Sequence, residues 1–597
     1  MPTTQTIYRT HRIQEISEHT QGLSITISGW VSSIRDHGEL IFIDLRESEI
    51  LQIRLNRDHL ADFDQLAKIK PESTIQVSGI IIKRESDDYN SSLRTGTIEL
   101  DATEIIILNM SKTLPFEIKK AHKTKESLRM KYKFLEMRSD SVQKTLLHRH
   151  KIIKSIRDSL DDQDFIEVET PVLTAGSEEG SREFIIPSRQ HPGEFYTLPQ
   201  APQQFKQMLM TGGIEKYFQI AKCFRDEDSR GDRQPEFTQL DMELAFVSMQ
   251  DIIDLNTKLF QKIIPAVYTS KWKIKPFQTI TYKTAMDKYG TDKPDIRFDL
   301  FLEDITDIVR KTEFEVFKKP IQDGGIVKCI KVSHNLQTKK ISKGQIEKLT
   351  LLAQSHGLGG LAYIIVKEDE LQSPIIKYLG ESVSQEIIKF TQAQPGDIVF
   401  FSAAHPKIAN AALDAVRRKL ADMLDLIPKK ELHPLWVIDF PQFERTDDGS
   451  WTFSHNPFSL PKPEYLKQHM KITDTAEILA QQYDLVLNGH EIAGGSIRSH
   501  SPDVLTATYK HMGYSDEQIQ KSIGHMLEAF SYGAPPHGGI AWGIDRLMMI
   551  LEEKESIRDV IAFPKTGSGQ DILFQSPSPL SEQKLHEANI RTTFLQK

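Results

Sequence analysis

Two adjacent segments of this chain alternate polar and apolar side chains with a strict period of two, and this pattern constrains the fold most. The first segment ends in Phe224-Arg225-Asp226-Glu227, and the second covers residues 233–243. A period of two is typical of β-strands that bury one face, so the pair predicts a hairpin. Its polar face would carry Gln219, Ala221, Cys223, Arg225, Glu227, Gln239, Asp241 and Glu243. Such a face indicates a site for a charged ligand, although a half-solvated sheet face explains the hairpin when it is taken alone.

Two further segments lie on either side of this hairpin in the sequence. Residues 165–173 form a strand-like run that ends near Pro171, and residues 538–547 form a glycine-rich strand that leads into a helix with Arg546. In order, the three segments resemble motifs 1, 2 and 3 of class II aminoacyl-tRNA synthetases. The whole chain, as far as residues 558–565, is similar to bacterial-type aspartyl-tRNA synthetases.

The resemblance implies an α+β multidomain fold. It has an N-terminal OB-fold β-barrel and a class II synthetase catalytic domain on an antiparallel sheet, with an inserted α+β domain. The residues support the barrel independently, because five short strand patterns fall between residues 24 and 100. The length of 597 residues agrees with about four domains. We expect these bounds: 1–110 for the anticodon-binding barrel, 111–145 for a basic hinge, 146–299 and 416–566 for the two parts of the catalytic domain, 300–415 for the inserted domain, and 567–597 for a C-terminal extension.

The composition excludes several classes of protein. Charged residues are 26% and hydrophobic residues 39%, which is ordinary for a soluble chain. Two cysteines, Cys223 and Cys329, cannot form a disulfide framework, which indicates a reducing compartment. The sequence shows no signal-peptide pattern and no apolar run of about 18 residues, so we expect a cytoplasmic protein without a membrane segment.

The net charge of −8 is unevenly distributed along the chain. Residues 1–110 carry 11 Lys/Arg and 17 Asp/Glu, whereas residues 111–158 carry 14 Lys/Arg and 5 Asp/Glu. A polyanion would be held by the basic stretch and not by the global field. A solvated helix with a basic face is the alternative explanation of that stretch.

The resemblance implies an enzyme that joins L-aspartate to ATP as aspartyl-adenylate and releases pyrophosphate. It then transfers aspartate to the 3′ end of tRNA(Asp), and in relaxed members also of tRNA(Asn). ATP is a substrate, and Mg²⁺ is the implied metal. The chain has no Walker-type phosphate loop and no dinucleotide glycine fingerprint, so ATP must be bound by another kind of site. Chemistry of this kind depends on charge neutralisation, to which the planar, permanently charged fork of arginine is suited.

Individual roles follow from the resemblance, position by position. Arg225 and Arg546 are the implied catalytic residues, with Arg225 on the α-phosphate and the amino-acid carboxylate. The positions implied for aspartate binding are Glu179, Gln203, Gln204, Phe205, Lys206, Arg225, Asp241, His455 and Arg498. The positions implied for ATP binding are Arg225, Asp226, Glu227, Gln234, Glu491, Gly543, Ile544, Asp545 and Arg546. The chain departs from the family pattern at Ala201 and Asn456, where the family usually has Ser and His.

The metal ligands follow from geometry as well as from the resemblance. Asn488-Gly489 stands between two apolar runs, which is the strongest short hairpin signal. With a two-residue turn, Val486 pairs with Glu491, and Asp484 lies diagonal to Glu491 at about 7 Å. Two carboxylates at that spacing can share Mg²⁺ that bridges phosphates, and the family uses these positions in that way. Two exposed hairpin carboxylates are the alternative.

A ligand role for Arg498 conflicts with the regular alternation of this hairpin. Strict alternation from Glu491 would turn Arg498 to the opposite face, so a bulge is needed, and Gly494-Gly495 is where we expect it. In the family this arginine binds the side-chain carboxylate of aspartate. With Lys206 it would form a cationic pocket that asparagine cannot satisfy.

Residues of the barrel carry the implied tRNA contacts. Arg35, Phe42, Gln52 and Glu99 match anticodon-contacting positions, with Phe42 offering a stacking plane or, alternatively, a core side chain. His37 stands where relaxed family members tend to have His and strict ones Leu, so it favours charging of tRNA(Asn) as well as tRNA(Asp). Motif 1 of this class lies at a symmetric interface, so we expect a homodimer.

Three other functions stay open from the sequence alone. An asparaginyl- or lysyl-type class II synthetase is disfavoured by the inserted domain and by the pair Lys206 and Arg498. A non-catalytic tRNA-binding paralogue is disfavoured by the presence of Arg225 and Arg546. An ATP-dependent amide-forming ligase would not explain the N-terminal barrel.

Overall fold

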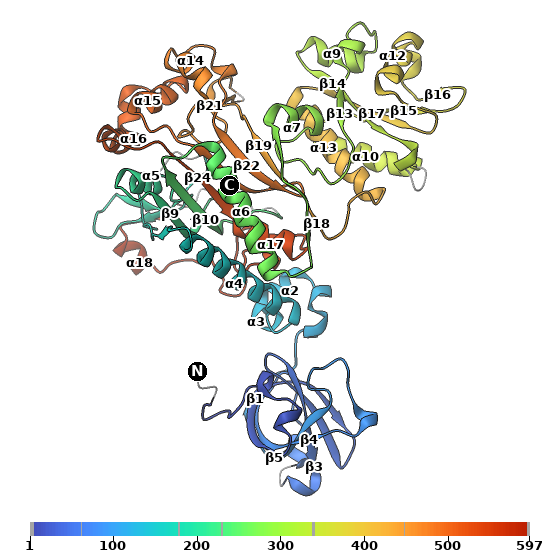
Figure 1. Cartoon of the computed structure of the whole chain (residues 1–597), viewed down its shortest axis with the longest axis vertical. Coiled ribbons are helices and arrows are strands. Elements are labelled where there is room, and N and C mark those ends of the chain that lie inside the picture. The colour runs from blue at the N-terminus through green and yellow to red at the C-terminus, as the bar shows by residue number, and fades with distance from the viewer. Residues whose placement is uncertain are drawn as a thin grey trace. The chain divides into compact units, whose positions relative to one another are not determined.

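The structure is a computed structural model that describes residues 5–60, 63–176, 180–227, 231–336, 341–446 and 448–593. The chain divides into two compact units, Met1–Thr124 and Lys125–Lys597, and each is described by itself (Figure 1).

The first unit is a closed five-stranded barrel. Its strands are β1 (Ser24–Asp36), β2 (Leu40–Arg46), β3 (Ile50–Asn56), β4 (Thr74–Lys83) and β5 (Ile98–Asn109). They close in the order β1-β2-β3-β5-β4, with β3 and β5 parallel and the other pairs antiparallel. Alternate side chains of every strand enter one apolar core, because a strand directs successive side chains to opposite faces. The predicted OB-fold barrel is confirmed.

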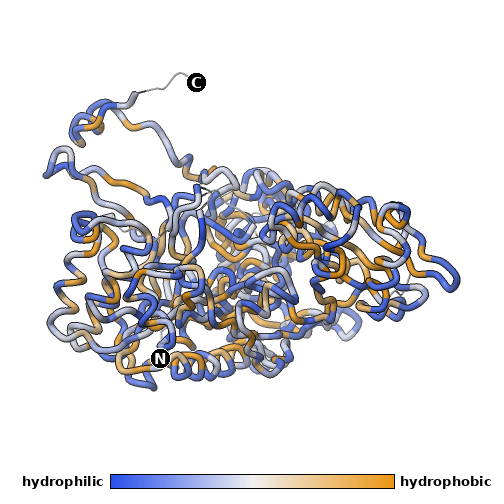
Figure 2. The backbone as a smooth tube through the Cα atoms, turned by 90° about the horizontal axis from the view of Figure 1, so that it is seen from above, coloured by the Kyte–Doolittle hydropathy of each residue, from blue (hydrophilic) through white to orange (hydrophobic). Residues whose placement is uncertain are grey.

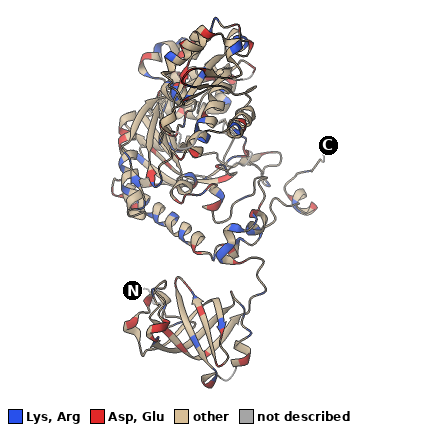
Figure 3. Cartoon of the chain, turned by 90° about the vertical axis from the view of Figure 1, so that its right-hand side faces the viewer, with Lys and Arg blue, Asp and Glu red and all other residues tan. Residues whose placement is uncertain are grey.

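Helices open the second unit. These are α2 (Glu126–Lys131), α3 (Lys133–Glu136) and α4 (Asp140–Asp161), so the helix expected from about residue 146 begins at Asp140. Lys and Arg recur along this stretch (Figure 3). Some of these cations are neutralised within the unit, however. Lys133 is buried and its Nζ donates to Glu136 Oε2 at 2.8 Å, and Arg129 pairs with the same carboxylate.

The catalytic part is an eight-stranded sheet in the order β12-β19-β22-β23-β24-β10-β9-β6. Its strands are β6 (Ile166–Glu167), β9 (Lys216–Phe224), β10 (Glu236–Ala245), β12 (Gln278–Thr281), β19 (Pro434–Ile438), β22 (Gln482–Leu487), β23 (His490–Ile497) and β24 (His537–Gly543). The inner pairs are antiparallel as predicted, whereas the edge pairs β6–β9 and β12–β19 are parallel. The fold class is confirmed, with a sheet that is mixed at its two edges.

One face of this sheet is covered by helices and forms the main apolar core. The helices are α4, α6 (Met249–Val267) and α17 (Ile544–Leu551). They pack Ile152, Phe260 and Leu547 against strand residues such as Leu485 and Trp542. The opposite face carries the polar side chains of the motif 2 hairpin, so the sheet has one dry face and one face available for ligands.

An inserted body leaves the sheet after β12 and returns at β19. It contains a second sheet in the order β13-β14-β17-β15-β16, with strands β13 (Leu302–Asp304), β14 (Ile326–Val332), β15 (Ala362–Val366), β16 (Leu371–Gln372) and β17 (Ile398–Ala404). Helices α10 (Lys343–Ser355) and α13 (Pro406–Met423) pack on one face, and α9 (Glu315–Gln322) and α12 (Glu381–Thr391) pack on the other. Helix α13 thus continues beyond residue 415. The apolar stretches of this body and of the catalytic part are orange in Figure 2.

No helix in the described part of the chain is long and apolar enough to cross a membrane.

Candidate active site

The motif 2 hairpin has the facing that its sequence predicts. Asp241 of β10 pairs with Gln219 of β9, while Leu240 and Met242 lie in the apolar core on the other face. Asp241 and Glu243 therefore project from the ligand face, and both side chains are fully buried.

Four charged side chains meet at this point of the sheet. Lys206 Nζ, on α5 (Gln203–Thr211), lies 2.7 Å from Asp241 Oδ1 and 3.1 Å from Glu243 Oε2. Arg498 Nε donates to Glu243 Oε1 at 3.0 Å, and Arg498 Nη2 lies 3.3 Å from Glu243 Oε2. All four residues are at most 2% exposed. The predicted cationic pocket is therefore a neutral cluster of two cations and two carboxylates.

Burial and pairing act on this cluster in opposite directions. Burial raises the pKa of Asp241, and the nearby Lys206 only partly opposes this effect. Burial also acts to raise the pKa of Glu243, but the charges of Arg498 and Lys206 outweigh it, so the Glu243 pKa is lowered. Glu243 is thus the carboxylate that keeps Arg498 charged and oriented in a dry site.

Arg498 reaches this cluster through a bulge, but at a different position from the predicted one. The register of β22 with β23 shifts between Val486–Glu491 and Leu485–Ala493, which leaves Ile492 as the extra residue. Ile492 and Ala493 both enter the apolar core, so the residues after them change face. The expected bulge at Gly494-Gly495 is wrong, because those glycines pair regularly with Asp484 and Tyr483.

A chain of hydroxyl groups fixes the outer side of Arg498. Its Nη1 donates to Ser496 Oγ at 2.7 Å, and Ser459 Oγ donates to the same oxygen at 2.9 Å. Asn456 Oδ1 accepts from Phe458 N–H at 3.0 Å and lies 3.3 Å from Ser459 Oγ. The amide of Asn456 therefore shapes the turn behind Arg498.

The two predicted metal ligands come together beside Gly494. A Cβ on Gly494 would lie 2.9 Å from Asp484 Oδ1 and 3.4 Å from Glu491 Oε1, so only glycine leaves both carboxylates this space. Asp484 is buried, and its Oδ1 has no hydrogen-bond partner among the described residues. Burial and repulsion by Glu491 raise the pKa of Asp484. Burial also acts to raise the pKa of Glu491, but nearby cations, with Arg546 first, lower it.

The carboxylates of Asp484 and Glu491 fit Mg²⁺ as oxygen ligands. Magnesium prefers oxygen ligands, takes one or two carboxylates from the protein and completes its shell with water and substrate phosphates. Within the described ranges, no cluster of three or more His, Cys, Asp or Glu side chains could hold a metal alone. Two carboxylates with an unpaired buried oxygen therefore suit a metal that arrives with phosphates.

Arg225 lies at the end of β9 with part of its guanidinium unpaired. The guanidinium stacks 5.1 Å from the centre of the Phe237 ring, and its buried Nε has no hydrogen-bond partner among the described residues. The next residue, Asp226, is exposed. Glu227 pairs with Arg233 at 2.9 Å and accepts from Ser181, and Gln234 Oε1 accepts from the Lys565 backbone N–H at 2.8 Å.

The motif 3 residues divide into two groups. Arg546 donates to the Glu491 backbone carbonyl and lies 3.4 Å from Asp232, so it borders the carboxylate pair. Ile544 lies in the apolar core, and Asp545 accepts from Thr238 N–H at 2.8 Å and from Arg149. These two side chains turn away from the ligand face. Gly543 begins the helix α17 as its N-cap residue.

The other positions predicted to bind aspartate lie on α5 or outside it. Gln203 is buried and donates to Gln207 at 3.1 Å, whereas Gln204 pairs with His525 of α16 (Asp516–Ser531) at 2.8 Å, and Phe205 is partly buried. His455 is exposed. Glu179 lies outside the described residues.

The barrel brings its predicted tRNA residues together. Arg35 Nη2 donates to Gln52 Oε1 at 2.9 Å, and Gln52 Nε2 donates to Glu99 Oε2 at 2.7 Å. Phe42 pairs with Arg35 across β1 and β2, and its ring packs edge-on to His37 at 5.8 Å. Phe42 is only partly buried, so it faces outward and does not belong to the barrel core.

Several residues that contact the candidate site were not predicted as site residues. Glu243 and Ser496 hold Arg498, Asp232 lies beside Arg546, and Arg149 holds Asp545. Alternation in β10 was the available signal for Glu243, since it shares the face of Asp241. Arg149 gave no local signal, because its partner Asp545 is distant in the sequence. Ser496 is only two residues from Arg498, but the face that both residues take depends on the bulge at Ile492.

Comparison with known proteins agrees with this geometry. Residues 125–567 match the family described as tRNA synthetases class II (D, K and N), and residues 25–108 match an OB-fold nucleic acid binding domain. The Aspartate--tRNA(Asp/Asn) ligase of Natranaerobius thermophilus is 42% identical over 592 residues, covering 98% of this chain and 100% of that protein. The protein of the same name from Bacillus subtilis is 41% identical and covers 98% of each chain. The Aspartate--tRNA ligase of Macrococcus caseolyticus is 42% identical, covering 96% and 97%.

Solved structures show the same fold at lower identity. The asparaginyl-tRNA synthetase of Pyrococcus horikoshii with asparaginyl-adenylate has a TM-score of 0.59 at 17% identity, covering 94% of this chain and 99% of that one. The chain belongs to the class II tRNA synthetases of the D, K and N group. This family uses ATP, and the predicted resemblance is confirmed.

Glu243→Gln tests the cluster directly. The amide keeps the shape but removes the charge that compensates Arg498 and Lys206, and breaking a buried pair in this way costs about 3–5 kcal/mol of unfolding free energy. Denaturant unfolding of the variant measures the loss. Glu236→Gln, on the same strand in a partly exposed pair with Lys565, serves as the control and should cost under about 1 kcal/mol. Equal losses in the two variants would contradict the cluster's role.

Proposed function

We propose that this chain is a cytoplasmic aspartate–tRNA ligase that charges both tRNA(Asp) and tRNA(Asn). The observation that carries the proposal is the buried Arg498, held by Glu243 and Ser496 and adjoined by Lys206. The names of the relatives, most of which say Asp/Asn, support the same substrate.

The choice of aspartate rests on the donors of Arg498. A guanidinium offers five N–H donors and no acceptor, and Glu243 and Ser496 take only part of them. A carboxylate of the substrate can accept the remaining N–H groups. The amide of asparagine would place its NH₂ donors against donors in a dry site, which leaves polar groups unpaired at a cost of about 1–3 kcal/mol each.

Activation would depend on Arg225 and Arg546. The unpaired edge of Arg225 can donate two parallel hydrogen bonds to the α-phosphate and the amino-acid carboxylate, which aligns the attack. Arg546 would neutralise charge on the released pyrophosphate. Asp484 and Glu491 would hold Mg²⁺, which supplies charge neutralisation at the phosphates when it is bound.

Arg498→Ala separates amino-acid recognition from nucleotide binding. We expect aspartate-dependent pyrophosphate exchange to fall by at least about 100-fold through the aspartate KM, with the ATP KM within about threefold, because Arg498 touches no nucleotide position. Exchange measured with each of the twenty amino acids checks the specificity of the wild type. A main effect on the ATP KM, or exchange driven by asparagine or lysine, would reject the assignment.

The barrel supports charging of two tRNAs. His37 stands in the turn between β1 and β2, is exposed, and lies against the partly exposed Phe42. An imidazole can donate or accept, so it can meet either last anticodon base, C of tRNA(Asp) or U of tRNA(Asn), where an apolar side chain cannot.

We expect both purified tRNAs to be charged with aspartate, and His37→Leu to depress tRNA(Asn) at least about fivefold more than tRNA(Asp), the loss of one hydrogen bond. Charging kinetics with each tRNA measure the ratio. A wild-type preference of several hundred-fold for tRNA(Asp), or an equal loss on both tRNAs in the variant, would refute this part of the proposal.

The proposed homodimer would use motif 1. Ile166, on the edge strand β6, is 51% exposed, and Val172 and Leu173 beyond it are 47% and 52% exposed. An edge strand followed by exposed apolar side chains is suited to a two-fold interface. Analytical ultracentrifugation at micromolar concentration should give about twice 68.2 kDa, and a monomer would contradict this prediction.

A further inference from the structure

The segment that leads into the inserted body lies on the ligand face of the catalytic sheet. Ile296 packs on an apolar cluster that contains Val486 of β22. Val486 shares its face of the strand with Asp484, since alternate residues of a strand point the same way. The segment therefore passes beside the carboxylate pair.

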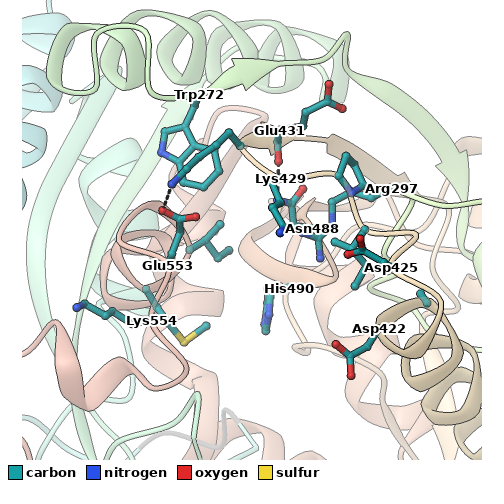
Figure 4. Close-up of a pocket in the computed structure, with 16 residues that line it drawn as sticks. Trp272, Arg297, Asp422, Asp425, Lys429, Glu431, Asn488, His490, Glu553 and Lys554 are labelled. Carbon is teal, nitrogen blue, oxygen red and sulfur yellow. Dashed lines mark hydrogen bonds and ion pairs between the residues drawn. The ribbon is translucent and has the colours of Figure 1, made fainter. Parts of the chain in front are cut away.

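The hairpin turn between β22 and β23 also contacts this segment. A Cβ on Gly489 would come 3.1 Å from Asp295 Cβ, so the two backbones approach closely. Asn488 and His490 line a cavity of about 410 Å³ together with Arg297 and Asp425, which belong to the base of the inserted body (Figure 4). The base of the inserted body and the hairpin of β22 and β23, which carries Asp484 and Glu491, are thus packed together.

A buried arginine fixes the segment. Arg417 of α13 is 0% exposed and its Nη2 donates to the backbone carbonyls of Asp295 at 2.8 Å and Phe298 at 3.1 Å. Its Nε donates to the Leu300 carbonyl, and its guanidinium lies 4.1 Å from the centre of the Phe298 ring. A buried cation that is held by carbonyl groups resists displacement, because moving away would leave it unpaired.

Lys293 is the cation that this rigid segment presents near the carboxylates. Lys293 precedes Asp295 by two residues, and Asp295 packs against Gly489, which precedes Glu491 by two residues. In agreement with this position, the charge of Lys293 contributes to the lowered pKa of Glu491 and opposes the raised pKa of Asp484. Among the described residues, its closest ion pair is a loose one with Asp292 at 3.9 Å. Its side chain is 41% exposed, so its ammonium group can move to a ligand.

We propose that Lys293 binds the β- and γ-phosphates of ATP, which makes the base of the inserted body part of the ATP site. Cations then converge on the phosphates from three parts of the chain: Arg225 from motif 2, Arg546 from motif 3, and Lys293 from the inserted segment. A lysine serves here as a compact point charge for a terminal phosphate, whereas the arginine forks fix the reacting phosphate. The inference deepens the proposed function and rests on it only for the identity of the amino acid.

Direct binding of ATP with Mg²⁺, measured by calorimetry on the full chain, tests the inference whatever amino acid is activated. Lys293→Ala should weaken binding at least about tenfold, and Lys293→Arg should stay within about threefold of the wild type. Lys283→Ala is the matched control, because Lys283 lies on the neighbouring α7 (Tyr282–Tyr289) and pairs with Asp287. It should leave the affinity unchanged.

Aspartate-dependent pyrophosphate exchange gives the second readout. Lys293→Ala should raise the KM of ATP and of pyrophosphate by at least about tenfold, with the aspartate KM within about twofold. Thermal unfolding of each variant shows whether the fold is kept. Equal affinity of wild type and Lys293→Ala for ATP with Mg²⁺, or a loss confined to kcat, would overturn the inference. A wild type that binds this ligand but exchanges without aspartate would reject the proposed function and leave the role of Lys293 standing.

Discussion

The buried contact between Glu243 and Arg498 is the constraint on which the rest of the site depends. Removing two charges from water costs several kcal/mol for each ion unless both are fully paired. The catalytic sheet meets this requirement by joining distant segments: Glu243 comes from β10, Arg498 from the end of β23, and Lys206 from α5. Strand order in the sheet is therefore tied to charge compensation as well as to the apolar core.

Glycine in the neighbouring strand makes room for this contact. A Cβ on Gly539 of β24 would lie 1.9 Å from Glu243 Oε2, and one on Gly495 would lie 2.0 Å from the Gly539 carbonyl. A larger side chain at Gly539 would push the carboxylate away from Arg498, and one at Gly495 would push strands β23 and β24 apart. The glycine-rich sequence of motif 3 thus reflects close packing of a carboxylate against a strand, in addition to any contact with a nucleotide.

Local patterns in the sequence predicted the parts of the site that lie within one hairpin. The alternation in the two strands β9 and β10 appears in the structure, and the turn at Asn488-Gly489 appears with the expected pairing. The position of the bulge was not predictable in this way. Glycine at Gly494-Gly495 suggested it, but the extra residue is Ile492, whose apolar side chain is stabilised by burial in the core. Here the tertiary packing of one side chain outweighs the conformational preference of glycine.

Charge counts along the sequence predicted the ligand sites less well, because tertiary contacts also decide which cations stay unpaired. The basic stretch 111–158 suggested a surface for a polyanion, yet Arg129, Lys133 and Arg149 pair with carboxylates of the same unit. The cationic pocket around Lys206 likewise contains two carboxylates. Net charge becomes informative only when the partners of each cation are known, and those partners are usually distant in the sequence.

The position of the inserted body explains how a catalytic sheet accommodates so large an addition. The chain leaves after β12 and returns at β19, and these strands are parallel neighbours at the edge of the sheet. In a parallel pair the chain leaves at one end of the strands and returns at the opposite end, so the inserted body forms the crossover connection between β12 and β19. The hydrogen bonds between these two strands are kept by the insertion. The segment that leads into the inserted body crosses the ligand face, and Arg417 holds this segment to α13. The inserted body is therefore mechanically connected to the hairpin of β22 and β23, which carries Asp484 and Glu491. An edge insertion can thus add a residue to an active site without rearranging the strands that carry the original ones.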